Sequence, residues 1–260
     1  MTTTVSYRLI SQNLDRQLEL TASRGAVKLE SDYYLENYQK ITSIDEFLND
    51  TRVFNFAMNA FGLSDLAFAK GYMRKILEGG VVEPSALANR TNDARITAFA
   101  ETFDFAFWRE ETMTRSGTGQ EVVDRYVRQS LEEDAGESDE GVRLALYFER
   151  MAPQIESAYD ILADAALVEV VLTALGLPSE FSAADIDKQA AALEARIDFE
   201  TLTEPEELDR FLLQFTALWE AENVAARDPI LNLFGVGSSS SSTVSLELAL
   251  TFSQLRLGGN

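Results

Sequence analysis

The chain has 260 residues, contains neither cysteine nor histidine, and carries 43 acidic against 22 basic side chains, a formal net charge of −21. The two absences exclude disulfides, thiolate nucleophiles, Ser-His-Asp triads and zinc sites with nitrogen or sulfur ligands. The excess of acid disfavours nucleic acid and anionic membrane surfaces as partners, because a negative field repels phosphate groups.

The N-terminal segment, residues 1–40, is predicted to be helical and amphipathic. Between residues 5 and 23 four apolar side chains recur at helical spacing and form one stripe: Tyr7, Ile10, Leu14 and Leu18. Arg24-Gly25 interrupts this pattern, and a second helical stretch with three tyrosines follows. No basic region precedes a continuous apolar core, so we expect no cleaved signal peptide. No uncharged apolar run is long enough to predict a membrane-spanning segment.

Residues 41–111 are predicted to form a first helical repeat. We expect helices over residues 44–61, with a break near Asp50, over 66–77, in a short turn after Pro84, and over 94–108. Ser43, with Glu46 three residues later, predicts a capping box at the start. Gly62 stands where a helix end requires a left-handed residue, and Leu63 is placed for the apolar contact that accompanies such an end.

A connector over residues 112–120 leads into a second repeat over residues 121–224. Its predicted helices cover residues 121–133, a stretch after Gly136, and a long segment opened by Thr203 with Pro205 in its first turn. This part carries 25 acidic against 7 basic residues, so most of the net charge belongs to it. A solvated acidic face is the ordinary explanation, and docking to a basic partner is the alternative.

The last segment, residues 225–260, differs in composition. Gly235 to Ser242 has the composition of a flexible Gly/Ser linker. Beyond it, residues 244–253 alternate apolar and other side chains with a strand period, whereas their Leu and Glu content favours a helix. We predict a short amphipathic helix and leave open that the segment adds as a strand to another sheet.

The two central parts of the chain match each other at a fixed offset, which indicates a duplicated helical unit. Seven pairs recur 114 residues apart: Ile41/Ile155, Ser43/Ser157, Leu48/Leu162, Asp50/Asp164, Ala60/Ala174, Gly62/Gly176 and Leu63/Leu177. Four more recur at an offset of 112: Thr91/Thr203, Ile96/Leu208, Phe99/Phe211 and Phe103/Phe215. Chance alignment of short capped helices is the alternative. The pattern predicts an all-α fold in which two related helical repeats form one elongated or bilobed domain.

The candidate chemical motifs do not predict a catalytic, cofactor-binding or metal-binding residue. The acidic run 132–141 lacks the ligand spacing of a calcium loop and is typical of an acidic interhelical turn. Phe234 to Ser238 lacks the lysine and third glycine of a phosphate loop. Asp185 and Asp187 form a carboxylate pair of the kind that composition alone produces. The aromatic run between Phe99 and Trp108 is explained mainly by core packing of a helix.

Several strings resemble a bacterial family catalogued as a domain of unknown function. They are Lys40 to Asp50, Ala57 to Leu63, Met73 to Gly80, Pro84 to Arg90, Val123 to Glu132 and Ala174 to Pro178. The similarity covers residues 33–223. The resemblance implies a helical protein without an assigned enzymatic activity or assigned site residues, encoded among flagellar genes of motile Gram-negative bacteria.

These observations predict a non-enzymatic structural component of the flagellum, exported without a cleaved signal and assembled through its terminal segments. The alternative is a cytoplasmic assembly or regulatory factor that holds a flagellar client. We expect flagellar proteins or further copies of the chain as partners, with no nucleic acid, no membrane insertion and no cofactor. The candidate contact residues are Leu9, Ile10, Leu14, Leu18, Leu246, Leu250 and Leu255. Folding of both terminal segments back onto their own core is the ordinary alternative.

Overall fold

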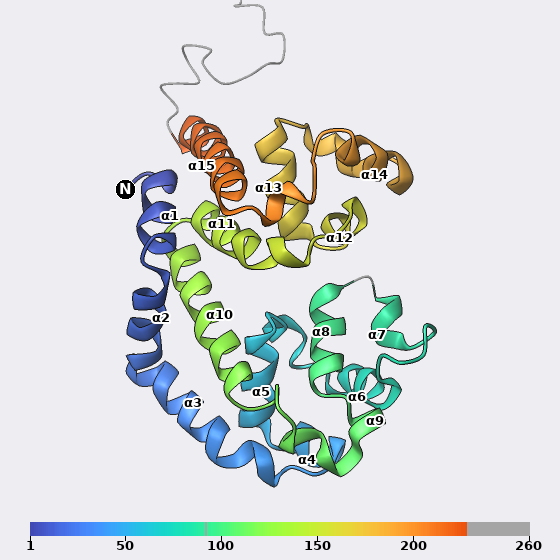
Figure 1. The fold of residues 1–260 in the computed structure, drawn as a ribbon. Coiled ribbons are helices and arrows are strands. Elements are labelled where there is room, and N and C mark those ends of the chain that lie inside the picture. Colours follow the sequence, from blue (N-terminus) through green and yellow to red (C-terminus); the bar gives the residue numbers. More distant parts are fainter. Residues whose placement is uncertain (92, 228–260) are drawn as a thin grey trace, which may run out of the picture. The chain divides into compact units, whose positions relative to one another are not determined.

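A computed structural model describes residues 1–91 and 93–227 of the chain, and every regular element in these ranges is a helix (Figure 1). The prediction of an all-α fold is therefore confirmed for the described residues. The predicted linker and amphipathic segment beyond residue 227 lie outside them. Within the same ranges, no helix combines the length and the apolar character needed to cross a bilayer.

The N-terminal segment forms three successive helices: α1 (Thr3–Ser11), α2 (Leu14–Ser23) and α3 (Gly25–Asn37). The single helix predicted over residues 5–23 is wrong at its centre. Asn13 is the reason, because its side-chain amide donates to the Leu9 carbonyl oxygen at 3.1 Å, which satisfies an acceptor at the end of α1. At the far end of the segment, the buried Tyr34 hydroxyl donates to the Thr118 carbonyl oxygen at 2.6 Å and ties α3 to the predicted connector.

The first hydrophobic core is built mainly by short helices that follow α3. They are α4 (Ile44–Asn49), α5 (Thr51–Ala60), α6 (Lys70–Gly79), α7 (Leu87–Arg90), α8 (Ala94–Thr102) and α9 (Phe105–Trp108), joined by 3₁₀ turns at Tyr38–Lys40, Ser64–Leu66 and Arg109–Thr114. Fully buried phenylalanines fill its centre, and the Phe47 ring meets those of Phe54 and Phe103 at centroid distances of 5.6 and 5.0 Å.

Two predicted boundaries change in this part of the chain. The helix expected over residues 94–108 is interrupted at Asp104, whose carboxylate accepts from the Phe107 N–H at 3.0 Å and so starts α9 as a separate element. The helix expected from Leu66 begins only at Lys70. The break predicted near Asp50 is confirmed, since the Asp50 carboxylate caps α5 by accepting from the Val53 N–H at 3.0 Å.

The second core is built by α10 (Gln120–Ser138), α11 (Glu140–Met151), α12 (Ala158–Leu162), α13 (Ala165–Leu175), α14 (Ile186–Glu194) and the first part of α15 (Pro205–Arg227). Three further 3₁₀ turns lie at Ala152–Gln154, Ser179–Ala183 and Thr201–Thr203. Gly136, predicted as a break, lies inside α10, which runs on to Ser138. The break falls at Asp139, because its carboxylate accepts from the Gly141 N–H at 2.9 Å and starts α11.

The positions paired at the 114-residue offset take matching local conformations. Gly62 and Gly176 have φ values of 66° and 61°, as a left-handed helix end requires. Leu63 donates its N–H to the Met58 carbonyl oxygen at 2.8 Å, and Leu177 does the same to Leu172 at 2.8 Å. Each pair closes the six-residue hydrogen bond that characterises this helix end. The predicted glycine stops are thus confirmed at both positions.

Both cores recruit residues from outside the predicted repeats. The first includes Val27 from α3 and Val123 from α10, and the second includes Tyr7 from α1. Helix α10 packs against α2, α3, α5 and α11 (Figure 1). It contributes apolar side chains at both cores. Contacts gather Met1–Trp219 into one compact unit, and a second unit begins at Glu220, inside α15.

Candidate functional site

Helix α1 presents one face to the second core and the other to solvent. Tyr7 is only 2% exposed and belongs to the second core, and Ile10 packs against the same core. Two hydrogen bonds hold the helix in place: Thr3 Oγ1 donates to Asp139 Oδ2 at 2.7 Å, and Ser11 Oγ donates to Glu149 Oε1 at 2.8 Å. The inner face of the N-terminal helix is therefore occupied by the chain itself.

The predicted contact residues fall into three groups. Leu9 is 51% exposed on the outer face of α1. Ile10 and Leu18 pack against the second and first cores, and Leu14 is half-buried. The C-terminal candidates Leu246, Leu250 and Leu255 lie outside the described residues. Helices α1, α2 and α3 carry further exposed apolar side chains, at Val5, Leu20, Leu29 and Leu35.

A buried ionic network links α10 to α11. Glu132 is 1% exposed, and its carboxylate accepts from Arg128 Nε at 2.8 Å and from Arg150 Nε and Nη2, each at 2.8 Å. Arg128 also donates to the Leu146 carbonyl oxygen at 2.8 Å. Two guanidinium groups thus share one carboxylate, and burial of these charges is tolerated because each has a charged partner.

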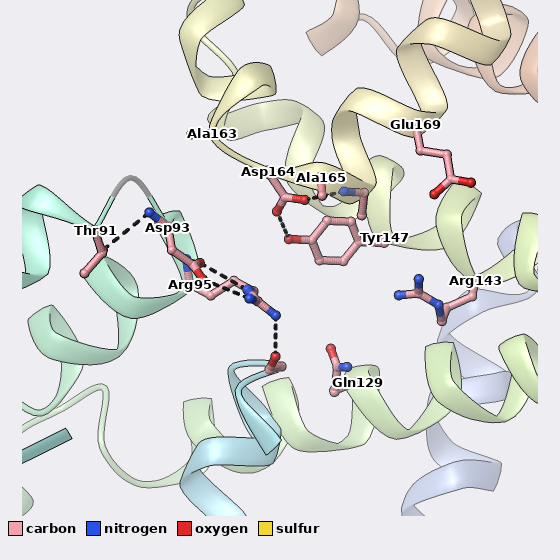
Figure 2. Close-up of a pocket in the computed structure, with 12 residues that line it drawn as sticks. Thr91, Asp93, Arg95, Gln129, Arg143, Tyr147, Ala163, Asp164, Ala165 and Glu169 are labelled. Carbon is pink, nitrogen blue, oxygen red and sulfur yellow. Dashed lines mark hydrogen bonds and ion pairs between the residues drawn. The ribbon is translucent and has the colours of Figure 1, made fainter. Parts of the chain in front are cut away.

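A polar cleft of about 560 Å³ opens beside this network, and Figure 2 shows its lining. On one side Asp93 caps α8 and pairs with Arg95, whose Nη2 lies 2.8 Å from Asp93 Oδ2. Arg95 Nη1 also donates to the Gly62 carbonyl oxygen at 2.7 Å. On the other side the Tyr147 hydroxyl of α11 donates to the Asp164 carboxylate that caps α13.

Three charged or titratable groups around the cleft, Tyr147, Arg143 and Glu169, have shifted pKa values with different causes. Burial raises the pKa of Tyr147, and the Asp164 carboxylate raises it further, so the phenol stays protonated. Arg143 forms an ion pair with Glu140, and this hydrogen bonding raises the pKa of Arg143. Burial, followed by the nearby Glu140, raises the pKa of Glu169. The lining therefore offers hydrogen-bond donors and acceptors of both signs rather than a field of one sign.

The described part of the chain contains no group of three or more acidic side chains placed to hold a metal ion. The acidic run predicted as an interhelical turn lies mostly in the last turns of α10, and its first member, Glu132, is turned inward to the arginines. Sequence reasoning assigns no role to Arg95, Arg143 or Tyr147. No local motif marks them: Arg143 and Tyr147 share α11, whereas Arg95 comes from α8 and reaches the same cleft only through packing.

The predicted aromatic run divides between core and surface. Phe99, Phe103 and Phe105 are buried, as core packing requires, whereas Phe107 and Trp108 are exposed. The two exposed rings pack edge to face at 4.8 Å, and the Arg115 guanidinium lies over the Trp108 ring at 4.2 Å.

The described residues thus form an all-α protein with two hydrophobic cores. Its exposed apolar side chains stand out on the surface, and Arg95 and Tyr147 in its cleft are paired with neighbouring carboxylates. The sequence profile of one family matches residues 60–208, and the chain belongs to that family, described as "Protein of unknown function (DUF1217)". The crystal structure of protein AGR_C_984 from Agrobacterium tumefaciens is similar to this chain. The TM-score is 0.80 and the identity 42%, over 85% of this chain and 94% of that one. A search of the curated proteins finds no match.

Proposed function

We propose that the protein is a non-enzymatic structural component of the bacterial flagellum that assembles through exposed apolar side chains of its N-terminal helices. Membership of the family supports a bacterial protein without an assigned activity. The flagellar setting rests on the resemblance described above, which implies genes placed among flagellar genes. Export without a cleaved signal is part of the proposal.

The observation that carries the proposal is the two-sided character of α1. Tyr7 and Ile10 are committed to the second core, whereas Val5 and Leu9 stand on the opposite face, each more than half exposed. Leu29 of α3 is exposed as well. Apolar side chains left in water on successive helices favour contact with another protein, because covering them releases hydration water. In this proposal Ile10 positions the helix and Leu9 makes the contact.

The pairing of Arg95 and Tyr147 with neighbouring carboxylates in the cleft supports the non-enzymatic part of the proposal. A general base or nucleophile needs a free, activated group poised for transfer. In the cleft, Arg95 is bound to Asp93, and Tyr147 is held protonated against Asp164. The two carboxylates are also the caps that start α8 and α13.

A second candidate is a cytoplasmic factor that holds a flagellar client before assembly. The same exposed face of α1 and α3 favours it, since a client could cover Leu9 and Leu29 as well as a neighbouring subunit could. The two candidates differ in where the protein is found at steady state. A structural component accumulates in the flagellum, and a client-holding factor stays in the cytosol.

The first prediction concerns Leu9→Asp. We expect the variant to be lost from purified hook–basal bodies and filaments while its total cellular amount and melting temperature stay unchanged, because Leu9 contributes little to the core. The measurement is fractionation followed by immunodetection. Ile186→Asp, which changes a comparably exposed side chain on α14, is the matched control and should assemble normally.

Recovery of Leu9→Asp in the flagellum at the wild-type level would refute the contact. Wild-type protein confined to the cytosol, bound to one flagellar client, would establish the second candidate instead. Point substitutions are preferable to deletion of the N-terminal helices, because deletion would also remove Tyr7 from the second core.

A further inference from the structure

The turn between the 3₁₀ helix at Ser64–Leu66 and α6 carries an isolated, almost fully exposed aromatic side chain. Phe68 is 86% exposed, although its neighbours Leu66 and Ala67 pack against the first core. A phenylalanine ring in water forgoes the burial that makes aromatic side chains dominant contributors at protein interfaces. Phe68 is therefore a candidate anchor for contact with another molecule.

A pocket with both aromatic and polar lining residues opens next to this turn. It has a volume of about 400 Å³, and Ala67, the residue before Phe68, is part of its wall. Phe56 of α5 and Tyr126 of α10 also line it, with their rings stacked at a centroid distance of 4.0 Å. A cavity of about 150 Å³ already accommodates a benzene ring, so this pocket has room for a phenylalanine side chain.

The rim of the pocket is held by side chains that pair with each other. Arg52 Nε lies 2.8 Å from Glu30 Oε2, and the Arg52 guanidinium lies over the Tyr33 ring at 3.9 Å from its centroid. The Asn59 side-chain amide donates to Ser64 Oγ at 3.1 Å. The Arg52–Glu30 pair balances its own charge, so an apolar ring entering the pocket would leave no charge unpaired there.

The distribution of charge along the chain favours a second copy of the chain as the partner that binds at this pocket. Residues 1–120 carry 16 acidic and 13 basic side chains, whereas residues 121–224 carry 25 and 7. Two copies of this chain repel each other least where they meet through the near-neutral part. Phe68 and the pocket both lie on that side of the division, except for Tyr126.

We propose that two copies of the chain associate by inserting Phe68 of each copy into the Phe56–Tyr126 pocket of the other. Because Phe68 directly follows a residue of the pocket wall, a two-fold axis close to this turn would bury both rings at once, as a self-complementary interface requires. The contact uses a different surface from Val5 and Leu9 on α1, and it borders α3 at Glu30, the residue after the exposed Leu29. It does not depend on the flagellar proposal and is tested on the purified protein alone.

The test is sedimentation equilibrium of the purified chain from micromolar to millimolar concentration. We expect wild-type protein to form a concentration-dependent dimer. Phe68→Asp should weaken it about 700-fold, because each dimer loses two rings and each ring is worth about 2 kcal/mol. Val82→Asp is the matched control, since Val82 is 67% exposed in the same near-neutral part, and it should leave the dimer intact.

A second variant tests the pocket. Asn55 is exposed at its rim, so Asn55→Trp should obstruct the pocket without disturbing the core, and the variant alone should be as monomeric as Phe68→Asp. An equimolar mixture of the two variants retains one intact ring and one intact pocket, and we expect it to recover a heterodimer. Circular dichroism checks that each variant keeps its helix content.

A wild-type protein that stays monomeric over the whole range would overturn the proposal. A dimer that survives Phe68→Asp, or that is lost equally with Val82→Asp, would overturn it as well. A mixture that fails to recover association would exclude the reciprocal insertion of ring and pocket.

Discussion

Glu132 shows how a single buried residue determines the junction of two helices. Its carboxylate accepts from Arg128 on its own helix and from Arg150 on α11. Removing one member of such a network leaves the others charged and unsolvated, which costs about 3–5 kcal/mol. The acid is thus required by its partners rather than by solubility, unlike most of the 43 acidic residues of the chain.

At this scale we predict that Glu132→Leu lowers the free energy of unfolding by about 3–5 kcal/mol, since both guanidinium groups lose their shared partner. Urea denaturation followed by circular dichroism measures the change. Glu137→Leu, an exposed position one turn and a half further along α10, is the control and should stay within about 0.5 kcal/mol of wild type. Equal losses for the two variants would contradict the interpretation.

Helices in this chain begin and end mainly through side chains and glycines close in sequence. Ser43 accepts from the Glu46 N–H at 3.2 Å to start α4, and the Asp50 and Asp164 carboxylates start α5 and α13. Gly62 and Gly176 end α5 and α13 in the left-handed conformation. These devices fix where the apolar faces begin and therefore which side chains reach each core.

At the element scale we predict that Gly62→Ala and Gly176→Ala each lower the free energy of unfolding by about 1–2 kcal/mol, the cost of a left-handed conformation for an L-residue. An added Cβ at Gly62 would meet only ordinary contacts, and at Gly176 it would meet open space, so the cost is conformational at both positions. Thermal unfolding of each variant gives the value. Gly71→Ala, in α6 with open space and no positive φ, should lose no stability. A loss there as large as at the two stops would refute the argument.

The two cores belong to one compact unit, residues 1–219, and α10 is the element they share. Its apolar side chains enter the first core at Val123 and the second at Ala135, and the Glu132 network lies between them. A helix that packs against both cores cannot leave one of them without weakening the other. We therefore expect the cores to unfold together.

At the scale of the whole molecule the two tryptophans report on this coupling. Trp108 ends α9 beside the first core, and Trp219 packs against the second. In the single-tryptophan variants Trp219→Phe and Trp108→Phe, we predict that the fluorescence transition of each coincides with its circular dichroism transition in urea. Two separated midpoints within one variant would show that the cores unfold independently and would contradict the coupling through α10.

The sequence predicts several helix starts and ends correctly, because the hydrogen bonds that form them join residues only a few positions apart. Asp50, Gly62 and Gly176 act through bonds that span two to five positions, so each was predicted and found. Where two local signals competed, the prediction failed: Asn13 and Asp104 divide helices that periodicity alone extends through them. The all-α class follows from the same short-range patterns.

The tertiary structure decided which faces remain accessible. Tyr7, Ile10 and Leu18 share a stripe in the sequence, yet Tyr7 and Ile10 join the second core and Leu18 the first. Thr3 meets Asp139 across 136 positions, and no sequence pattern encodes such a pair. The exposure of Phe68 beside its pocket likewise depends on how α3, α5 and α10 pack. By itself the sequence determined the helical class and the helix ends marked by Asp50, Gly62 and Gly176, because those interactions are local. Packing between distant segments decided the cores, the cleft and the surfaces available to partners.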